Sequence, residues 1–199
     1  MPEGPEVTIM TEAINNLLKD TEIISWEFNN KSRYHKKAPD GYIDFNIDLT
    51  NENKQVKVIE IKNKSKFMYW RFSNGTVLFQ TLGLSGGWYK KSQSNSGLII
   101  TFKVLDKTKT NYGKEQKLYF DDQRRFGTLK FFDSSNANKE LEAKLKTIGP
   151  DILNDEQLIF ADYLKIMRQK RVGKRIIANV LMDQKLISGV GNYLRSEIL

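Results

Sequence analysis

The first seven residues, MPEGPEV, place a proline and two acids where an N-terminal amine could do chemistry. Removal of Met1 would leave Pro2 with a free secondary amine, which can attack an electrophilic sugar carbon and form an iminium adduct. The neighbouring Glu3 could then protonate the ring oxygen of the sugar and move protons afterwards. Prolines and acids are also good residues for starting a helix. On these residues alone both interpretations stay open.

A second candidate is the turn SGVGN at residues 188–192. Its glycines, Gly191 among them, allow the backbone to approach a ligand closely, and Asn192 is expected to be the N-cap of the next helix. Amides at a helix N-terminus can bind phosphate. Lys174 and Arg175, expected on the preceding helix, favour such a site. An ordinary connection between two helices is the alternative.

A third candidate is DDQRRFG at residues 121–127, which we expect at the end of a strand. An exposed aromatic ring can wedge between bases while a nearby guanidinium bonds to the orphaned base. Arg124 and Phe126 have the types and spacing for this pair of tasks. The alternative is a hairpin with a buried Phe126 and an arginine paired to Asp121 or Asp122.

Composition narrows the classes of protein that the chain can represent. It has no cysteine and one histidine, His35, so disulfides and Cys-based zinc sites are excluded and a His-rich metal site is not expected. A net charge of +8 suits a polyanionic partner. There is no apolar run of about 18 residues and no signal-peptide pattern. We therefore expect an intracellular, soluble protein without a membrane partner.

The spacing of apolar residues predicts the elements that position these candidates. Residues 3–18 have the period of an amphipathic helix. Short runs with β character then continue to about residue 132, which predicts a β-sandwich or barrel. A polar stretch at 133–138 resembles a linker, and the chain turns helical after Gly149 and Pro150. The expected strands include 56–61, 67–72, 76–82, 98–104, 117–122 and 128–132, and the expected later helices are 158–167, 173–184 and one from 193.

Several stretches in one order resemble the formamidopyrimidine-DNA glycosylase/endonuclease VIII family of base-excision repair enzymes. They are MPEGPEV, KSKFMYW with Lys66, LGLSG (82–86), DQRRFG (122–127), IGPDIL (148–153) and LMDQKLISGVGNYLRSEIL (181–199). The start MPEGPE and the segment GNYLRSEIL are most similar to the endonuclease VIII-like enzymes of eukaryotes and large DNA viruses.

The resemblance implies an α+β fold in three parts. An N-terminal helix and a two-layer β-sandwich would occupy residues 1–133, a linker 134–150, and a helix-two-turn-helix domain 151–199. Family members continue past the second helix of that motif into a zinc or zincless finger, whereas this sequence ends inside the helix at Leu199. The finger region is therefore expected to be absent from these residues.

The same resemblance implies roles for individual residues. Pro2 matches the nucleophile, Glu3 the essential acid, Glu6 a second acid that organises the site, Lys66 a lysine that contacts phosphate and assists catalysis, and Asn192 a phosphate ligand. The residues that would fill the space left by an everted base are Leu84, Arg124 and Phe126.

The implied activity is that of a bifunctional DNA glycosylase and AP lyase. It would remove oxidised pyrimidines, hydantoins and formamidopyrimidines through a Schiff base on Pro2, followed by β,δ-elimination, with no metal or cofactor. The implied partner is double-stranded DNA that contains an oxidised base or an abasic site, bound by a monomer inside the cell. A non-catalytic DNA-binding module of the same fold is the alternative.

Two further departures from the family pattern concern DNA contacts. Leu84 stands where bacterial members usually carry methionine, and Thr81 stands where they often carry a histidine that contacts phosphate. The contact made by that histidine is therefore not expected in this chain.

Overall fold

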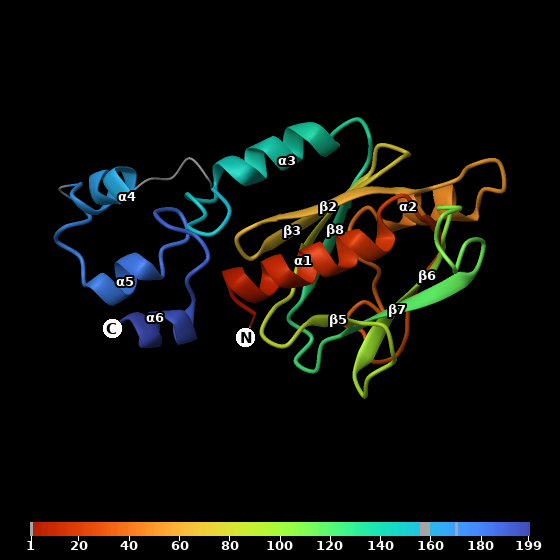
Figure 1. Cartoon of the computed structure of the whole chain (residues 1–199), viewed down its shortest axis with the longest axis horizontal. Coiled ribbons are helices and arrows are strands. Elements are labelled where there is room, and N and C mark those ends of the chain that lie inside the picture. The colour runs from red at the N-terminus through yellow and green to blue at the C-terminus, as the bar shows by residue number, and fades with distance from the viewer. Residues whose placement is uncertain (1, 156–159, 170) are drawn as a thin grey trace.

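The computed structural model describes residues 2–155, 160–169 and 171–199 and confirms the expected α+β fold class (Figure 1). Two antiparallel four-stranded sheets, with orders β1-β6-β7-β5 and β2-β3-β4-β8, form a sandwich. The strands are β1 (Glu22–Phe28), β2 (Val58–Lys64), β3 (Phe67–Phe72), β4 (Val77–Thr81), β5 (Gly87–Tyr89), β6 (Ser96–Lys103), β7 (Glu115–Asp121) and β8 (Thr128–Phe132). The helices are α1 (Gly4–Leu18), α2 (Tyr42–Thr50), α3 (Ala137–Lys146), α4 (Phe160–Met167), α5 (Ile177–Leu181) and α6 (Asn192–Ile198).

An aromatic cluster joins the two sheets. Trp26 of β1 and Trp70 of β3 are almost fully buried, and their rings meet edge to face at a centroid distance of 5.6 Å. Phe45 and Phe131 pack against Trp26 at 5.8 and 5.7 Å. Such aromatic pairs add about 0.5–1.5 kcal/mol each to the burial of their surface, so this cluster makes a rigid base for the site.

Helix α1 is attached along β2. Its apolar face buries Val7, Ile14 and Leu18, as the helical spacing predicted. On the same side, Asn15 Oδ1 accepts the backbone N–H of Ile61 at 2.7 Å. In this position the first turn of α1 points toward the part of the chain that contains α5 and α6 (Figure 1).

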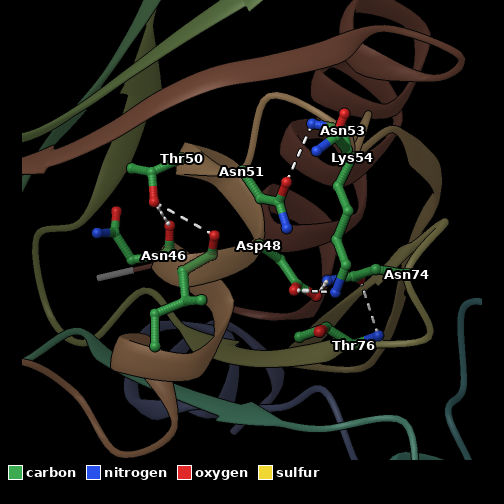
Figure 2. Close-up of polar contacts among 9 residues, drawn as sticks. Asn46, Asp48, Thr50, Asn51, Asn53, Lys54, Asn74 and Thr76 are labelled. Atoms are coloured by element: carbon green, nitrogen blue, oxygen red, sulfur yellow. Dashed lines mark hydrogen bonds and ion pairs between the residues drawn. The ribbon is translucent and has the colours of Figure 1, made fainter.

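Helix α2 lies in a stretch that we expected to be β-structure, so that expectation is wrong for residues 42–50. Tyr42, Phe45 and Leu49 follow each other at spacings of three and four residues, which suits one face of a helix, and all three pack on the core. The end of α2 is held by Asp48, which accepts bonds from Lys54 Nζ at 2.5 Å and Asn74 Nδ2 at 2.8 Å (Figure 2).

The segment expected as a linker contains helix α3. Its Ala137 and Leu141 are buried against Phe67 and Val77, on the sheet that contains β3 and β4. The segment is therefore packed on the sandwich, while the boundaries of the domains stay a prediction.

The helix expected at 173–184 is reduced to α5, so the placement of Lys174 and Arg175 on it is wrong. Gly173 and the β-branched Ile176 have low helix propensity, and the Arg175 guanidinium is engaged by Asp183 Oδ2 at 2.8 Å. Of the helix expected at 158–167, α4 covers 160–167, and the first two positions lie outside the described residues. None of the helices in the described ranges has the length and apolar character that crossing a membrane requires.

Candidate active site

The start of α1 lies against the loop that precedes α6. The N–H of Gly4 donates to the carbonyl oxygen of Gly189 at 2.9 Å. A Cβ atom on Gly4 would lie 3.0 Å from Gly189 Cα, so this close backbone approach requires a glycine. Two of the three candidate stretches, from opposite ends of the sequence, therefore form one site.

Glu3 is fully buried in this contact, with 0% of its surface exposed. Its carboxylate accepts N–H bonds from Gly191 at 2.6 Å, Tyr193 at 3.0 Å and Leu194 at 3.4 Å. A buried carboxylate needs such partners because its desolvation is costly. The backbone donors predicted to hold phosphate are thus occupied by an acid of the chain itself.

The expected N-cap of α6 is wrong by one residue. Gly191 is the N-cap, with φ −129° and ψ −159°, and Asn192 is the first residue of the helix. The reason is that Gly191, with an extended backbone, already accepts the first intrahelical bond, from the N–H of Arg195 at 2.9 Å. Asn192 is exposed at the surface of the same turn.

Lys66 enters the site from the turn between β2 and β3. Its half-buried side chain donates from Nζ to the carbonyl oxygen of Val190 at 2.8 Å. Burial lowers the pKa of Lys66, and the carboxylates of Glu3 and Glu6 oppose this shift without cancelling it. Lys66 therefore gives up its proton more readily than an exposed lysine does.

Asp151 is a site residue that the sequence reasoning missed. Its carboxylate, fully buried, accepts the N–H of Ser65 at 2.5 Å and the side-chain amide of Asn154 at 2.8 Å. It thereby holds the turn that carries Lys66. In the sequence, Asp151 is the aspartate of IGPDIL, a stretch that supports the family resemblance but was assigned no role in the site.

The loops at 82–86 and 122–127 form a second group. Ser85 Oγ donates to Asp122 Oδ1 at 2.8 Å, and Gly127 N–H donates to Asp122 Oδ2 at 2.7 Å. Gly83 has φ +65°, and a Cβ atom there would lie 2.6 Å from the nitrogen of Gly127. The two loops are therefore locked together as one unit.

This unit presents an aromatic ring to solvent. Phe126 is 57% exposed, so the alternative hairpin with a buried Phe126 is wrong. The carboxylate of Asp122 accepts hydrogen bonds from Ser85 and Gly127. The side chain of Arg124 is exposed, and that of Leu84 is half-buried. The arrangement leaves the tip of the unit available for contact with a ligand.

The structure thus sorts the predicted residues into three groups. One group surrounds the start of α1, and the second lies on the paired loops. The third, Lys174 and Arg175, has no hydrogen bond or ion pair with either of these groups among the described residues. The first group consists of Pro2, Glu3, Glu6, Lys66, Gly191 and Asn192. Within the described ranges, no three Asp, Glu or His side chains are grouped as metal ligands would be.

Gly191→Ala is expected to disrupt the first group. The new Cβ atom would lie 2.2 Å from Glu3 Oε1 and 2.7 Å from Lys66 Nζ, so both side chains must move. We expect a loss of about 1–3 kcal/mol in the free energy of unfolding, measured with urea. Gly173→Ala is the control, because the nearest atom to its Cβ is 3.8 Å away. Equal stability of the two variants would contradict the described packing.

Comparison with known proteins places this arrangement in a family. Residues 1–129 match the family model of the formamidopyrimidine-DNA glycosylase N-terminal domain. The formamidopyrimidine-DNA glycosylase of Rickettsia bellii (strain OSU 85-389) is 28% identical over 200 residues, which cover 100% of this chain and 66% of that protein. The protein of the same name from Wolbachia sp. subsp. Brugia malayi (strain TRS) is 31% identical over 204 residues, with coverage of 100% and 66%.

Solved structures share the fold at lower identity. The wild-type Lactococcus lactis Fpg (MutM), in a complex with an oxidised pyrimidine containing DNA, superposes with a TM-score of 0.71 at 19% identity. MutM in complex with carbocyclic 8-oxo-G containing DNA gives a TM-score of 0.72 at 19% identity. Both matches cover 100% of this chain and 67% of the other.

The chain therefore spans about two thirds of the length of its relatives, 66% for the two named above. The family model covers 129 of the 199 residues, including Pro2, Glu3, Lys66 and the paired loops. The chain belongs to the formamidopyrimidine-DNA glycosylase family.

Proposed function

We propose that the protein is a DNA glycosylase and AP lyase of base-excision repair in which Pro2 is the nucleophile. The observation that supports this most is the burial of Glu3, whose carboxylate is held by three backbone N–H groups next to Pro2. An acid that served only to start α1 would not need N–H donors from the distant turn before α6. Here a carboxylate is fixed beside the amine that removal of Met1 would free.

The proposed reaction starts with attack of the Pro2 nitrogen on C1′ of the damaged nucleotide. The bond from C1′ to the base breaks, and the base leaves with the proton that the Pro2 nitrogen loses on forming the new bond. Glu3 protonates O4′, so that the sugar ring opens and an iminium forms between Pro2 and C1′. The iminium acidifies the C2′ proton. Its removal expels the 3′ phosphate, a second elimination expels the 5′ phosphate, and water finally releases the sugar remnant from Pro2.

The nucleotide must leave the duplex before this attack, because C1′ is not accessible in a stacked pair. Unstacking costs a few kcal/mol, which side chains inserted into the gap partly offset. Phe126, 57% exposed on the locked loops, and its neighbours Leu84 and Arg124 are suited to this task. The substrates that we propose are oxidised pyrimidines, hydantoins and formamidopyrimidines in double-stranded DNA.

The finer assignments belong to the same proposal. MPEGPE and GNYLRSEIL favour the endonuclease VIII-like branch of eukaryotes and large DNA viruses. Residues 1–133, 134–150 and 151–199 would be the catalytic domain, linker and helix-two-turn-helix domain of a monomer that works on DNA inside the cell. Lys66, Lys174 and Asn192 would contact phosphates. Gly191 and Arg175 belong to the same proposal, although the N–H of Gly191 donates to Glu3 and the guanidinium of Arg175 to Asp183.

Arg124→Ala is expected to reduce binding to damaged DNA selectively. We expect affinity for a duplex with an abasic site to fall about tenfold, because the orphaned base loses its partner, whereas affinity for undamaged duplex stays within about twofold. Fluorescence anisotropy on both duplexes measures the ratio. The control is Arg125→Asn, since Arg125 has φ +56° and asparagine tolerates this conformation. Equal losses on both duplexes would make Arg124 a phosphate contact.

The proposal is tested by strand cleavage and borohydride trapping on a duplex with one abasic site. The chain that begins at Pro2 is compared with the same chain carrying one extra glycine before Pro2, which turns the amine into an amide. Cleavage and a covalent complex with the free Pro2 alone would support the enzyme. Equal DNA binding by both forms, with no cleavage by either, would support the non-catalytic DNA-binding module.

A further inference from the structure

Tyr193 makes two contacts in the site that neither the motifs nor the family comparison assigned. Its backbone N–H donates to Glu3 Oε1 at 3.0 Å, and its hydroxyl donates to Glu6 Oε1. The other oxygen of Glu6 accepts the backbone N–H of Glu3 at 2.9 Å. Tyr193, Glu6 and Glu3 therefore close a ring of hydrogen bonds between the first turn of α6 and the first turn of α1.

The ring holds the peptide group that carries Pro2. The N–H of Glu3 belongs to the peptide bond between Pro2 and Glu3, so its bond to Glu6 sets the plane of that peptide. The fixed plane leaves one rotation, about the Cα–C bond of Pro2, between that peptide and the proline nitrogen. Glu6 is itself exposed, and the Tyr193 hydroxyl is the group that holds its second oxygen.

The pKa shifts of Glu6 and Tyr193 agree with a hydrogen bond donated by the Tyr193 hydroxyl to the Glu6 carboxylate. Burial tends to raise the pKa of Glu6, but the hydrogen bonds from Tyr193 and from the Glu3 N–H outweigh it, so the pKa is lowered. The hydrogen bond to Glu6 raises the pKa of Tyr193 to about 12. At neutral pH a phenol therefore donates to a carboxylate. The other titratable side chains facing this pair are Glu3 and Lys66.

We propose that Tyr193 is a positioning residue for the nucleophile: it holds Glu6, which holds the Pro2–Glu3 peptide in the orientation from which Pro2 attacks. The Tyr193 hydroxyl bonds to Glu6, and only the backbone N–H of Tyr193 bonds to the Glu3 carboxylate. The inference rests on the proposed function, and its tests separate the failure of one from the failure of the other.

The first test is Tyr193→Phe, which removes the hydroxyl and keeps the backbone N–H. Under single-turnover conditions on an abasic duplex, we expect the rate of trapping to fall about tenfold, because the reacting atoms lose orientation. Since Tyr193 and Glu6 are exposed and water competes for their bond, the loss stays far below that of a catalytic residue. Affinity for the duplex should stay within about twofold. Tyr112→Phe, on an exposed tyrosine of a remote loop, is the matched control.

A double-mutant cycle tests whether Tyr193 acts through Glu6. Alanine at position 6 removes both carboxylate oxygens, so that neither the Glu3 N–H nor the Tyr193 hydroxyl keeps its partner there. In the Glu6→Ala background, Tyr193→Phe should therefore slow trapping by less than about twofold. A full tenfold loss in that background would show that Tyr193 acts by another route and would overturn the inference.

The pH dependence of the trapping rate and of the Glu6 carboxylate distinguishes a positioning role from a general loss of packing, which would not shift either titration. Removing the hydroxyl takes away a contact that lowers the pKa of Glu6, so that pKa must rise in Tyr193→Phe. The acidic limb of the trapping rate should shift to higher pH, and NMR titration of the Glu6 carboxyl carbon should shift in the same direction without any need for activity. An unshifted titration would overturn the contact itself.

The outcomes are distinct. If the wild-type chain traps DNA through Pro2 and Tyr193→Phe traps it equally fast, the inference fails and the proposed function stands. If the wild-type chain forms no adduct that depends on Pro2, the proposed function fails, and with it the positioning role, whatever the titration of Glu6 shows.

Discussion

Glu3→Gln is expected to slow covalent trapping of an abasic duplex by about a thousandfold, within the usual range for loss of a general acid. The amide cannot protonate O4′. It also turns an NH₂ group either toward the N–H of Tyr193 or toward the N–H groups of Gly191 and Leu194, all of which the carboxylate now accepts. Single-turnover trapping at saturating enzyme measures the rate of the chemical step separately from binding.

Glu12→Gln is the matched control, because Glu12 lies on the same helix with an exposed side chain. It should trap DNA at the wild-type rate. If Glu3→Gln also kept the wild-type rate, the buried carboxylate would be a structural cap of α6 and the assigned acid would lie elsewhere.

Asp151→Ala is expected to cost about 3 kcal/mol in the free energy of unfolding. The substitution leaves the N–H of Ser65, the N–H of Leu153 and the amide of Asn154 without their acceptor. For a chain of this length, that loss corresponds to a melting temperature lower by about 6–12 °C. Because the Ser65 contact orders the turn that carries Lys66, trapping should also slow in the folded variant.

Asp40→Ala is the control for this change, since Asp40 is exposed. Its melting temperature should stay within about 2 °C of the wild-type value. If the melting temperature of Asp151→Ala were also within about 2 °C of the wild-type value, water would replace the carboxylate at no cost in stability.

The best-predicted elements are those in which a few neighbouring residues determine both the type of element and where it begins and ends. The expected strands at 67–72 and 128–132 coincide with β3 and β8, because turn-forming residues flank short runs of β-formers. Helix α2 was missed because three apolar residues at helical spacing stand among strands. The predicted helix at 173–184 was too long because residues 171–175 form turns after α4, in which the N–H of Gly173 donates to the carbonyl oxygen of Gln169 and that of Arg175 to Val172.

Only those residues of the site that lie in recognisable motifs could be predicted from the sequence. Pro2, Glu3 and Lys66 follow from the order of short stretches along the chain, and the structure brings Glu3 and Lys66 to the same turn. That Glu3 caps α6, and that Tyr193 holds Glu6, depend on contacts between residues almost two hundred positions apart. No periodicity or spacing in the sequence encodes such a contact directly, so it emerges only from the packing of α1 against the segment 188–194.

The site offers a second amine that could compete for the role of nucleophile. Burial lowers the pKa of Lys66, which increases the fraction of neutral amine, and its Nζ lies at the turn that also binds Glu3. A buried lysine of this kind is a known route to a Schiff base. Lys66 and Pro2 therefore have to be told apart by the bond that each would form.

The most direct measurement is to locate the adduct. The chain that begins at Pro2 is trapped with borohydride on an abasic duplex, digested, and analysed by mass spectrometry for the peptide that carries the reduced sugar. We expect the sugar to be attached to the N-terminal nitrogen of Pro2, and we expect Lys66→Arg to form this adduct at a reduced rate. A sugar attached to Lys66 Nζ, or a yield unchanged when the Pro2 amine is blocked, would contradict this expectation.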